Sequence, residues 1–391
     1  MISLEQALEI VLHSARTLGS ERVGLAESLG RILAEDIASD IDMPPFDKSM
    51  VDGYACRRAD LANGLEVVDV IQAGTWPRKS IATNQCAKIM TGAAVPPGAD
   101  CVVMVEQTEN TDGGAVRFTG EQTFDRICRK AEEIRAGQVV LPRGERICPP
   151  HIAVLAAVGC AAPLVAQRPA VAVVAGGDEL VAPGIRPGPG QIRNSNSAQL
   201  AGQLEATGAV VRDYGTVRDV AEDIDRVLKA ALAENDVVLL SGGVSMGDFD
   251  LVPAVLRQNR VELLFEKIAV KPGKPTVFGV SEQAYCFGLP GNPVSTLVTF
   301  ELLVKPFLFQ LMGHDFSPQF VQMRLDDSIH RRDTERQGWI PVAMTSPETV
   351  KPVEYHGSAH ILALCRADGL VPVDIGVAHL AKGTSVAVRL L

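Results

Sequence analysis

Several common signatures are missing from this sequence, and each absence excludes a class of function. The 391-residue chain has a formal net charge of −10 and lacks the basic excess that nucleic-acid binding requires. None of its eight cysteines belongs to a C-x-x-C pair, so a zinc site is not expected. The N-terminal residues include Glu5 and Glu9 and do not resemble a signal peptide, and no apolar run is expected to reach the length of a membrane span. We therefore expect a soluble, cytoplasmic protein with no membrane or nucleic-acid partner, whose cysteines are mostly buried as small apolar side chains.

Two familiar catalytic arrangements are also absent. The stretch Lys271-Pro-Gly-Lys-Pro275 is not a P-loop, because no glycine lies five residues before Gly273 and Lys274 is followed by proline. No Ser-His-Asp or Cys-His arrangement is evident, since the loops that carry the chemistry described below hold no histidine.

Alternating strand and helix patterns over residues 169–310 predict a doubly wound, mostly parallel α/β domain. Strand patterns occur at 171–175, 209–214, 237–240 and 285–289. Between them we expect helices capped by Ser197 and Asp219, and a long apolar helix that begins at Asn292 and Pro293.

The segments on either side of this domain have a different texture. Residues 39–137 are turn-rich, with short β patterns and no long helix, which indicates an inserted β domain. From residue 314 onward, short alternating strands predict a C-terminal β domain. Helical spacing is found at 4–18, where Ser3 and Gln6 suit a capping box, and also at 23–35 and 151–158.

The most informative stretch follows the strand at 237–240. Ser241, Gly242 and Gly243 leave the backbone N–H groups open to a ligand, and Ser245 adds a hydroxyl. Two carboxylates, Asp248 and Asp250, come next. Ligands of open α/β sheets sit at the carboxyl ends of strands, so this stretch indicates an anion site beside a cation site, although a plain tight turn gives the same glycine pair.

Three further loops, each expected to follow a strand of the α/β domain, carry related chemistry. Gly176 to Leu180 combines glycines with Asp178 and Glu179, which suit Mg²⁺ or water, although Asp178 alone is equally compatible with a helix cap. In the loop 271–275 two prolines stiffen a backbone that carries Lys271 and Lys274, a combination that favours a phosphate or another oxyanion. The loop 288–295 leads into a helix N-terminus, which attracts anions. Together the four loops predict a phosphorylated ligand handled with Mg²⁺.

These loops, in this order, resemble those of the molybdopterin molybdenumtransferase (MoeA) family, which is related to the E domain of gephyrin. The resemblance covers nearly the whole chain, and its most specific parts are Ser241-Gly-Gly-Val-Ser-Met-Gly-Asp248, Lys271-Pro-Gly-Lys-Pro275 and Leu289-Pro-Gly-Asn-Pro-Val-Ser295, with Val51-Asp-Gly-Tyr-Ala55 and Met90-Thr-Gly92 in addition. It implies an elongated homodimer with a cleft shared between subunits. It also implies four domains: an α/β domain (1–19 and 166–313), a small connecting α/β domain (20–38 and 138–165), an inserted β domain (39–137) and a β-barrel-like C-terminal domain (314–391).

The resemblance also implies a reaction and a set of site residues. Adenylylated molybdopterin is hydrolysed with Mg²⁺, AMP leaves, and molybdate is inserted at the dithiolene sulfurs; molybdopterin adenylyltransferase and apo-molybdoenzymes are the implied transfer partners. Glu179 and Asp250 are expected to hold the metal. The expected catalytic residues are acids, namely Asp52, Glu133, Glu179, Asp219 and Asp250. The expected substrate-binding residues are Thr91, Gly242, Gly243, Ser245, Asp248, Lys271, Lys274, Pro275, Pro290, Asn292 and Ser295.

The chain departs from the family pattern in a few loops. Before the connector, where the family has an Asn-Ile-Arg segment and then Gly-Glu-Asp-Ile, the differing residues here are Arg126, Cys128, Ala131 and Glu133. Where the family has Thr before Gly-Asp-Glu, this chain has a glycine pair that includes Gly177, and the C-terminal Gly-Ser-Gly loop is Gly357-Ser-Ala-His360. Two other functions therefore stay open: a cofactor-binding scaffold or carrier without turnover, and a nucleotide pyrophosphate hydrolase on the same α/β domain.

Overall fold

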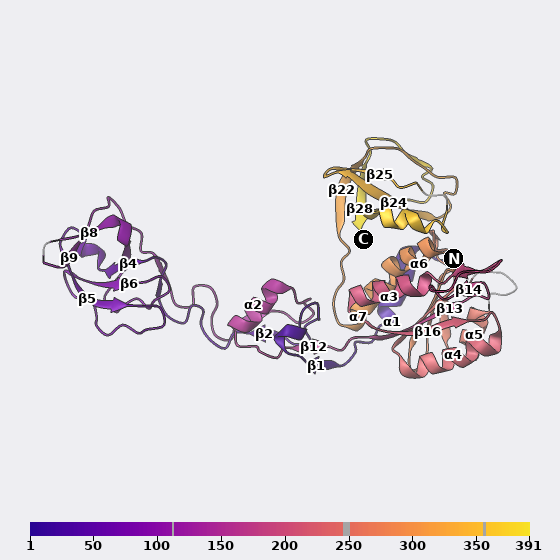
Figure 1. Ribbon diagram of the computed structural model, residues 1–391, viewed down its shortest axis with the longest axis horizontal. Helices are drawn as coiled ribbons and strands as arrows, with labels where there is room; N and C mark the ends of the chain where they lie inside the picture. Colours follow the sequence, from indigo (N-terminus) through magenta and orange to yellow (C-terminus); the bar gives the residue numbers. More distant parts are fainter. Residues whose placement is uncertain (112, 245–250, 355–356) are drawn as a thin grey trace.

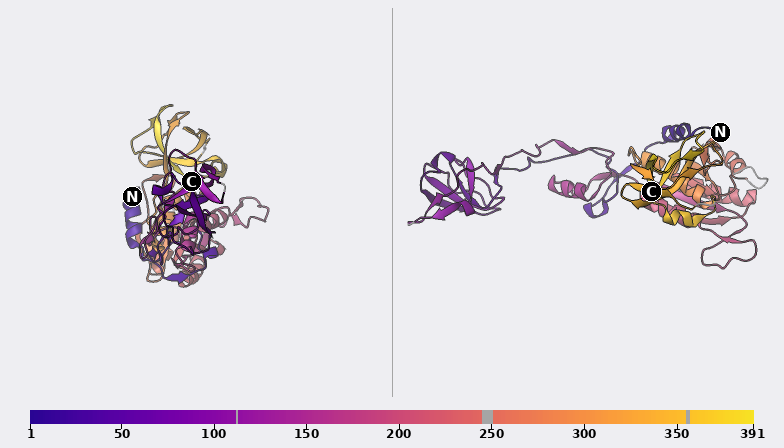
Figure 2. Two further views of the ribbon diagram at one scale, coloured as in Figure 1. Left: turned by 90° about the vertical axis from the view of Figure 1, so that its left-hand side faces the viewer. Right: turned by 90° about the horizontal axis from the view of Figure 1, so that it is seen from above.

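The computed structural model, which describes residues 1–111, 113–244, 251–354 and 357–391, is strongly elongated. A three-layer α/β unit and a C-terminal sheet lie at one end, and a separate β sheet lies at the far end of a long arm (Figures 1 and 2). A small connecting unit with helix α2 lies between them. The chain leaves the α/β unit after α1, runs out along the arm to the far sheet, and returns along the arm to enter β13. The far sheet is therefore an insertion, as predicted.

The central sheet has the strand order β16-β13-β17-β21-β20-β18. The first four strands are parallel to one another, whereas β20 and β18 are antiparallel to their neighbours. The bounds of these strands are β13 Ala170–Gly176, β16 Val210–Val217, β17 Val237–Ser241, β18 Glu262–Phe265, β20 Val277–Val280 and β21 Tyr285–Leu289. A doubly wound and mostly parallel sheet is therefore confirmed.

Alternate side chains of the central strands bury opposite faces of this sheet. Val173 and Leu239 pack with helices on one face, and Ala172 and Val238 pack with helices on the other. The first face is covered by α1 (Leu4–Ser14), α3 (Asn196–Thr207) and the run from α6 to α7, and the second by α4 (Ala221–Glu234) and α5 (Val252–Gln258). Two cores of this kind explain why the central strands β13 and β17 are apolar at nearly every position.

Three of the predicted helices begin or end at residues other than those expected, and local hydrogen bonds explain the difference for α1 and α3. α1 has the predicted capping box at Ser3 but ends at Ser14 rather than Leu18, because the Tyr285 hydroxyl donates to the Ser14 carbonyl and accepts from the Arg16 amide. Ser197 does not cap α3; its amide donates to Asn194 Oδ1, and the helix begins at Asn196. Nor does Asp219 cap α4, which begins at Ala221 after Val220 without a side-chain cap.

The predicted helix over residues 23–35 is wrong. Only the 3₁₀ turn η1 (Leu25–Glu27) is helical there. The rest pairs with distant backbone: the Leu33 amide donates to the Glu145 carbonyl, and the Ile147 amide donates to the Arg31 carbonyl. The connecting unit also contains β1 (Ser20–Arg22), β2 (Ile37–Ala38), β11 (Val139–Leu141), α2 (Pro149–Ala157) and β12 (Leu164–Ala166). Tertiary pairing here overrides a local helical pattern.

The long apolar helix begins at Pro293 as predicted, with Asn292 as its N-cap residue but without a cap from the Asn292 side chain. It comprises α6 (Pro293–Thr299), the π-helical turn η4 (Phe300–Val304) and α7 (Lys305–Leu311). Contrary to expectation, this run is long and apolar enough by composition to cross a membrane, with 19 residues and a mean hydropathy of 1.4, but 83% of its apolar window is buried inside the protein. Its burial is that of a core helix.

The two other six-stranded sheets are largely antiparallel. The arm sheet has the order β7-β4-β6-β5-β9-β8. Its strands are β4 Gly53–Cys56, β5 Leu65–Ile71, β6 Gln85–Ile89, β7 Cys101–Met104, β8 Thr108–Asn110 and β9 Ala115–Phe118. Beside this sheet, β3 (Lys48–Ser49) pairs with β10 (Ile127–Cys128). The C-terminal sheet has the order β19-β24-β25-β22-β28-β26, with β19 Val270–Lys271, β22 Phe320–Leu325, β24 Gln337–Ser346, β25 Thr349–Pro352, β26 Gly369–Val373 and β28 Ser385–Leu390. An additional pairing of β24 with β26 closes the C-terminal sheet into a barrel-like form. All eight cysteines are free thiols, and four of them are buried.

Candidate functional site

A cavity of about 800 Å³ lies at the carboxyl edge of the central sheet. The strands β13, β16, β17 and β21 all end at this edge because they are parallel. Its lining residues come from the loops after these strands, from the start of α3 and from the C-terminal segment, and they are Ala175, Gly176, Gly177, Glu179, Leu180, Ile192–Asn196, Asp219, Ser241–Val244, Pro275, Pro290–Pro293, Ala359 and Ile361. Its volume suits a small-molecule ligand of cofactor size.

Glycine backbone forms the floor of this cavity. Gly242 has φ +96°, and a Cβ placed on it would lie 2.5 Å from the Gly176 carbonyl oxygen. A Cβ on Gly291 would lie 3.6 Å from the Gly242 Cα, and the Gly242 amide donates to the Leu289 carbonyl at 3.1 Å. Three loops from three strands thus meet backbone to backbone, and at Gly242 only glycine permits the approach.

Asn196 ties these loops together from the first turn of α3. Its Nδ2 group donates to Ser241 Oγ at 2.8 Å and to the Gly291 carbonyl at 2.7 Å, and it lies 3.4 Å from Thr296 Oγ1. Its Oδ1 is buried without a hydrogen-bond partner. Sequence reasoning missed Asn196 and the neighbouring Arg193 as site residues, although an Asn-Ser-Asn segment at the end of a glycine-rich loop is a signal that could have found them.

The N-termini of two helices face the cavity. Asn196 begins α3, and Asn292 and Pro293 begin α6. The unpaired amides and the dipoles of these helices create a positive potential there. Among the described residues that line the cavity, Arg193 is the single basic one and Glu179 and Asp219 are the acidic ones.

The two acids lie against the glycine turn that follows β13. A Cβ on Gly177 would lie 2.6 Å from Glu179 Oε2, and a Cβ on Gly176 would lie 3.7 Å from Asp219 Oδ1. The Asp219 amide donates to Asp178 Oδ1 at 3.3 Å. Asp219, expected to cap α4, therefore lines the cavity instead, next to Glu179.

The loop 271–275, here called the lysine loop, lies at the same edge of the sheet but does not connect to the sheet as predicted. It does not follow a strand of the central sheet; it precedes β20, which is antiparallel and therefore starts at the edge where β21 ends. Only Pro275 of this loop lines the cavity, and Lys274 is exposed. Lys271 belongs to β19 of the C-terminal sheet and forms an ion pair with Asp333 at 3.3 Å. The hydrogen bond from Arg336, together with Lys271, lowers the pKa of Asp333 to about 2.

The predicted site residues of the arm do not meet the cavity of their own chain. Asp52 and Thr91 lie together in the far unit of Figure 1, where the Thr91 amide and hydroxyl donate to Asp52 Oδ1 at 2.6 and 2.7 Å. These hydrogen bonds lower the pKa of Asp52. Both side chains are exposed, as is Glu133 at the near end of the arm, whose amide donates to the Met43 carbonyl.

The structure gives a physical meaning to some departures from the family pattern. Ala131 has φ +58° and Arg126 has φ +52°, a conformation in which glycine or asparagine is less strained. Ala359 lines the cavity, and the Ser358 carbonyl accepts from the Val294 amide at 3.1 Å, so the altered C-terminal loop contacts the start of α6.

Three predicted residues, Ser245, Asp248 and Asp250, lie outside the described residues. Ser295 is buried in the first turn of α6 and does not line the cavity. Within the described ranges, no group of three or more His, Cys, Asp or Glu side chains is placed to hold a metal ion. Glu179 and Asp219 nevertheless fit Mg²⁺, which commonly takes only one or two carboxylates and completes its shell with water and substrate phosphates.

Comparisons with known proteins agree along the whole chain. Residues 2–159 match the MoeA N-terminal region (domain I and II), residues 172–310 match a probable molybdopterin binding domain, and residues 322–391 match the MoeA C-terminal region (domain IV). Proteins named molybdopterin molybdenumtransferase from Staphylococcus epidermidis and Staphylococcus aureus are 37% and 35% identical over 100% of this chain and 95% of their own length. A crystal structure of a molybdopterin biosynthesis MoeA protein from Pyrococcus horikoshii has a TM-score of 0.84 at 33% identity and covers 100% of this chain and 99% of that one. A second MoeA structure from the same organism has a TM-score of 0.86 at 27% identity, with full coverage of both chains. The chain therefore belongs to the MoeA family of molybdopterin molybdenumtransferases.

Proposed function

We propose that this transferase of molybdenum cofactor biosynthesis hydrolyses adenylylated molybdopterin with Mg²⁺, releases AMP and inserts molybdate at the dithiolene sulfurs, in the cavity at the carboxyl edge of the central sheet. The observation that supports this most directly is the convergence of glycine backbone, two helix N-termini and two carboxylates on one cavity. Such a cavity attracts a phosphorylated ligand and places acidic oxygens beside it.

The residues divide into those that hold the ligand and those that act on it. The amides of Gly243 and Asn292 would donate to the phosphates, and Gly242, whose own amide donates to the Leu289 carbonyl, leaves room for the ligand to approach the backbone. Pro275 and Pro290 give the walls a fixed shape. Arg193 lines the cavity, and we add it to the predicted phosphate ligands. Lys274 is exposed beside this edge and is free to swing toward an anion, whereas Lys271 is committed to Asp333 and acts through the position of the loop.

Glu179 and Asp219 would carry the hydrolytic step. A water molecule adds to the phosphorus on the pterin side and passes a proton to one of the two carboxylates. The bond between this phosphorus and the bridging oxygen breaks, and AMP leaves with that electron pair. Glu179 and Asp219 are placed to orient this water and to share Mg²⁺, which would neutralise phosphate charge when bound. Asp250 remains a proposed metal ligand on sequence grounds.

The separation of the arm from the cavity supports a homodimer with a shared cleft. Asp52 and Thr91 are hydrogen-bonded to each other and exposed, yet they are far from the cavity of their own chain. In a homodimer they would reach the partner's cavity, as would Glu133. The four-domain division stated above (1–19 with 166–313, 20–38 with 138–165, 39–137, 314–391), a cytoplasmic location, and transfer partners among adenylyltransferase and apo-molybdoenzymes belong to the same proposal.

One assay tests the reaction. Purified chain is incubated with adenylylated molybdopterin, Mg²⁺ and molybdate, and AMP release and the reconstitution of an apo-molybdoenzyme are measured. Both products together are the expected result. Cleavage of simple dinucleotides would favour a pyrophosphate hydrolase, and tight pterin binding without AMP release would favour a carrier; either outcome contradicts the proposal.

A mixed-dimer experiment tests the shared cleft. Asp52→Asn and Asp219→Asn chains are each expected to be inactive, because the first alters the arm and the second alters the cavity. Unfolding and refolding the two chains together should restore activity, since one cleft of each mixed dimer then has both wild-type residues. A mixture that stays as inactive as its components would contradict the shared cleft.

A further inference from the structure

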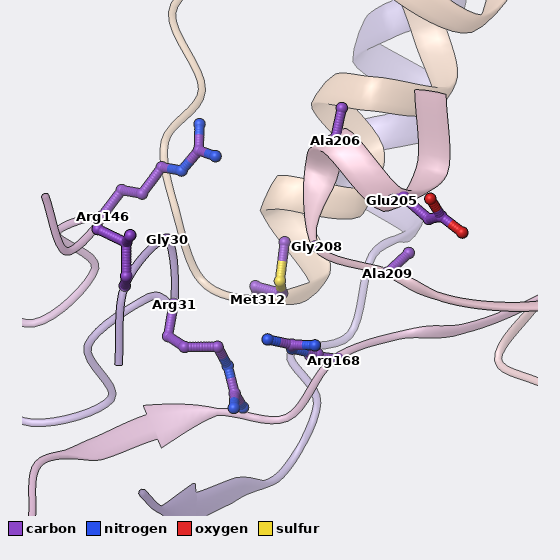
Figure 3. Close-up of a pocket in the computed structure, with 10 residues that line it drawn as sticks. Gly30, Arg31, Arg146, Arg168, Glu205, Ala206, Gly208, Ala209 and Met312 are labelled. Atoms are coloured by element: carbon purple, nitrogen blue, oxygen red, sulfur yellow. The ribbon is translucent and has the colours of Figure 1, made fainter. Parts of the chain in front are cut away.

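A second cavity, of about 300 Å³, lies where the connecting unit meets the α/β unit. Its wall is formed by Arg31 and Arg146 from the connecting unit, Arg168 from the short segment between β12 and β13, Glu205 at the end of α3, and Met312 after α7 (Figure 3). Three arginines from three separate segments thus border one small space, remote from the cavity described above.

Two of these arginines are held in place by the protein. Arg31 is 8% exposed, and its Nη2 group donates to the Ala166 carbonyl and to Glu21 Oε1 at 2.7 and 2.5 Å. The guanidinium of Arg146 lies 5.5 Å from the ring centroid of Phe309, a cation–π contact that fixes its position. Anchored guanidinium groups lose little freedom when they bind a ligand.

Only part of the positive charge around this cavity is balanced by acids among the described residues. Glu21 compensates Arg31. In the part of the chain that the structure describes, neither Arg146 nor Arg168 forms an ion pair, and Glu205, the one acidic residue of the wall, points away from all three arginines in Figure 3. Like charges gathered at one space repel each other unless an anion joins them.

We propose that this junction cavity binds a small tetrahedral oxyanion of the phosphate class, either free or as the phosphate group of a nucleotide. Arg31 and Arg168 lie at the same end of the cavity in Figure 3 and would form the donor pair, with Arg146 on the other side adding attraction. The planar guanidinium fork matches the oxygen spacing of such an anion. The volume, at the low end for ligand pockets, admits a phosphate with a few waters.

Binding at this position would stiffen the base of the arm. Arg31 belongs to the connecting unit, whereas Arg168 directly precedes β13 of the α/β unit. An anion held by both joins the two units, so its occupancy would bias the direction in which the arm points. This inference concerns a site separate from the proposed reaction and does not depend on it.

Calorimetric titration of the full-length protein with inorganic phosphate tests the site. Arg168→Gln is expected to weaken one phosphate-binding event at least tenfold, because one of two charge-assisted donors is lost. Arg168→Lys should bind with intermediate affinity. Arg117→Gln removes an arginine of the arm sheet that is also exposed, and this variant should bind as the wild type does. Equal phosphate binding by wild-type and Arg168→Gln proteins would overturn the proposal.

A chemical footprint provides a second measurement that needs no variant. Phenylglyoxal modifies accessible arginines, and phosphate should slow the modification of Arg168 but not that of Arg117, as read by peptide mass spectrometry. Parallel titrations with molybdate and AMP show which anion source is preferred; each should lose affinity in Arg168→Gln. An Arg168 modification rate that phosphate leaves unchanged would overturn the proposal.

Discussion

The backbone contact between Gly242 and Gly176 leads to a quantitative prediction. In Gly242→Ala, the alanine must adopt φ +96°, and its Cβ would lie 2.5 Å from the Gly176 carbonyl oxygen. The left-handed conformation costs about 1–2 kcal/mol for a residue with a Cβ, and the overlap in a packed region costs about 1–3 kcal/mol more. We therefore expect a loss of about 2–5 kcal/mol in the free energy of unfolding of the α/β unit.

Gly215→Ala is the matched control. Gly215 has φ +78° in the same unit, but a Cβ there meets nothing within 4 Å. Only the conformational cost of about 1–2 kcal/mol applies. The difference between the two variants isolates the overlap.

Urea unfolding followed by Trp339 fluorescence measures both losses. Trp339 is 4% exposed and packs in the core that covers the first face of the central sheet, whereas Trp76 is 69% exposed in the arm and can be replaced by Phe. The overlap should also separate the loops of the cavity and reduce AMP release by roughly 10²-fold, the effect expected of a displacement of about 1 Å. Equal stability losses in the two variants would refute the claim that the loops are packed backbone to backbone.

Three further predictions concern the arm, the lysine loop and its ion pair. Ala131→Gly should stabilise the arm by up to about 1 kcal/mol, because Ala131 has φ +58° and the relief of this strain outweighs the entropy that glycine adds to the unfolded chain. Thermal unfolding followed by Trp76 fluorescence measures the change, and a lower midpoint in the variant would contradict it. The pKa of Asp333 in the folded protein is about 2, below its ordinary 3.8, so the stability that its ionised form contributes is complete above about pH 4 and is lost as the pH falls toward 2. In urea unfolding at pH 5 and pH 3, Asp333→Asn should lack this loss of stability. The same pH dependence in wild type and variant would contradict the ion pair. Lys274→Ala should weaken binding of the phosphorylated pterin by about 1–3 kcal/mol, the range for a charge-assisted hydrogen bond; unchanged affinity in calorimetry would remove that role.

The elements that the sequence predicted well are those in which one pattern decides the outcome. The capping box at Ser3, the buried strand that ends at Ser241 and the proline-started helix at Pro293 all follow from local chemistry. The meeting of Gly176, Gly242 and the loop after β21 at one edge was also predictable, since parallel strands end on the same side.

The parts that could not be predicted depend on distant partners. Residues 23–35 have helical spacing, but hydrogen bonds to residues 145–147 and 164–166 decide their structure. From its local sequence Asp219 suits a helix cap, and only the resemblance to the MoeA family indicated a catalytic acid. The fold places it in the wall of the cavity beside Glu179. Lys271 was expected to bind an anionic ligand because it lies in a proline-stiffened loop with a second lysine. Its ion pair with Asp333 depends on the folding of the C-terminal domain and could not be read from the local sequence.

The most direct test of the catalytic cavity is the rate of AMP release from adenylylated molybdopterin, with Mg²⁺ and molybdate present, in wild-type and Asp219→Asn proteins. Asp213→Asn, an exposed acid on the neighbouring strand β16, serves as the control. If the cavity at the carboxyl edge is the catalytic site, Asp219→Asn should lower the rate at least 10²-fold, the order of effect typical of a lost catalytic acid–base or metal-orienting group, while the control stays near the wild-type rate. A wild-type rate in Asp219→Asn would contradict this assignment.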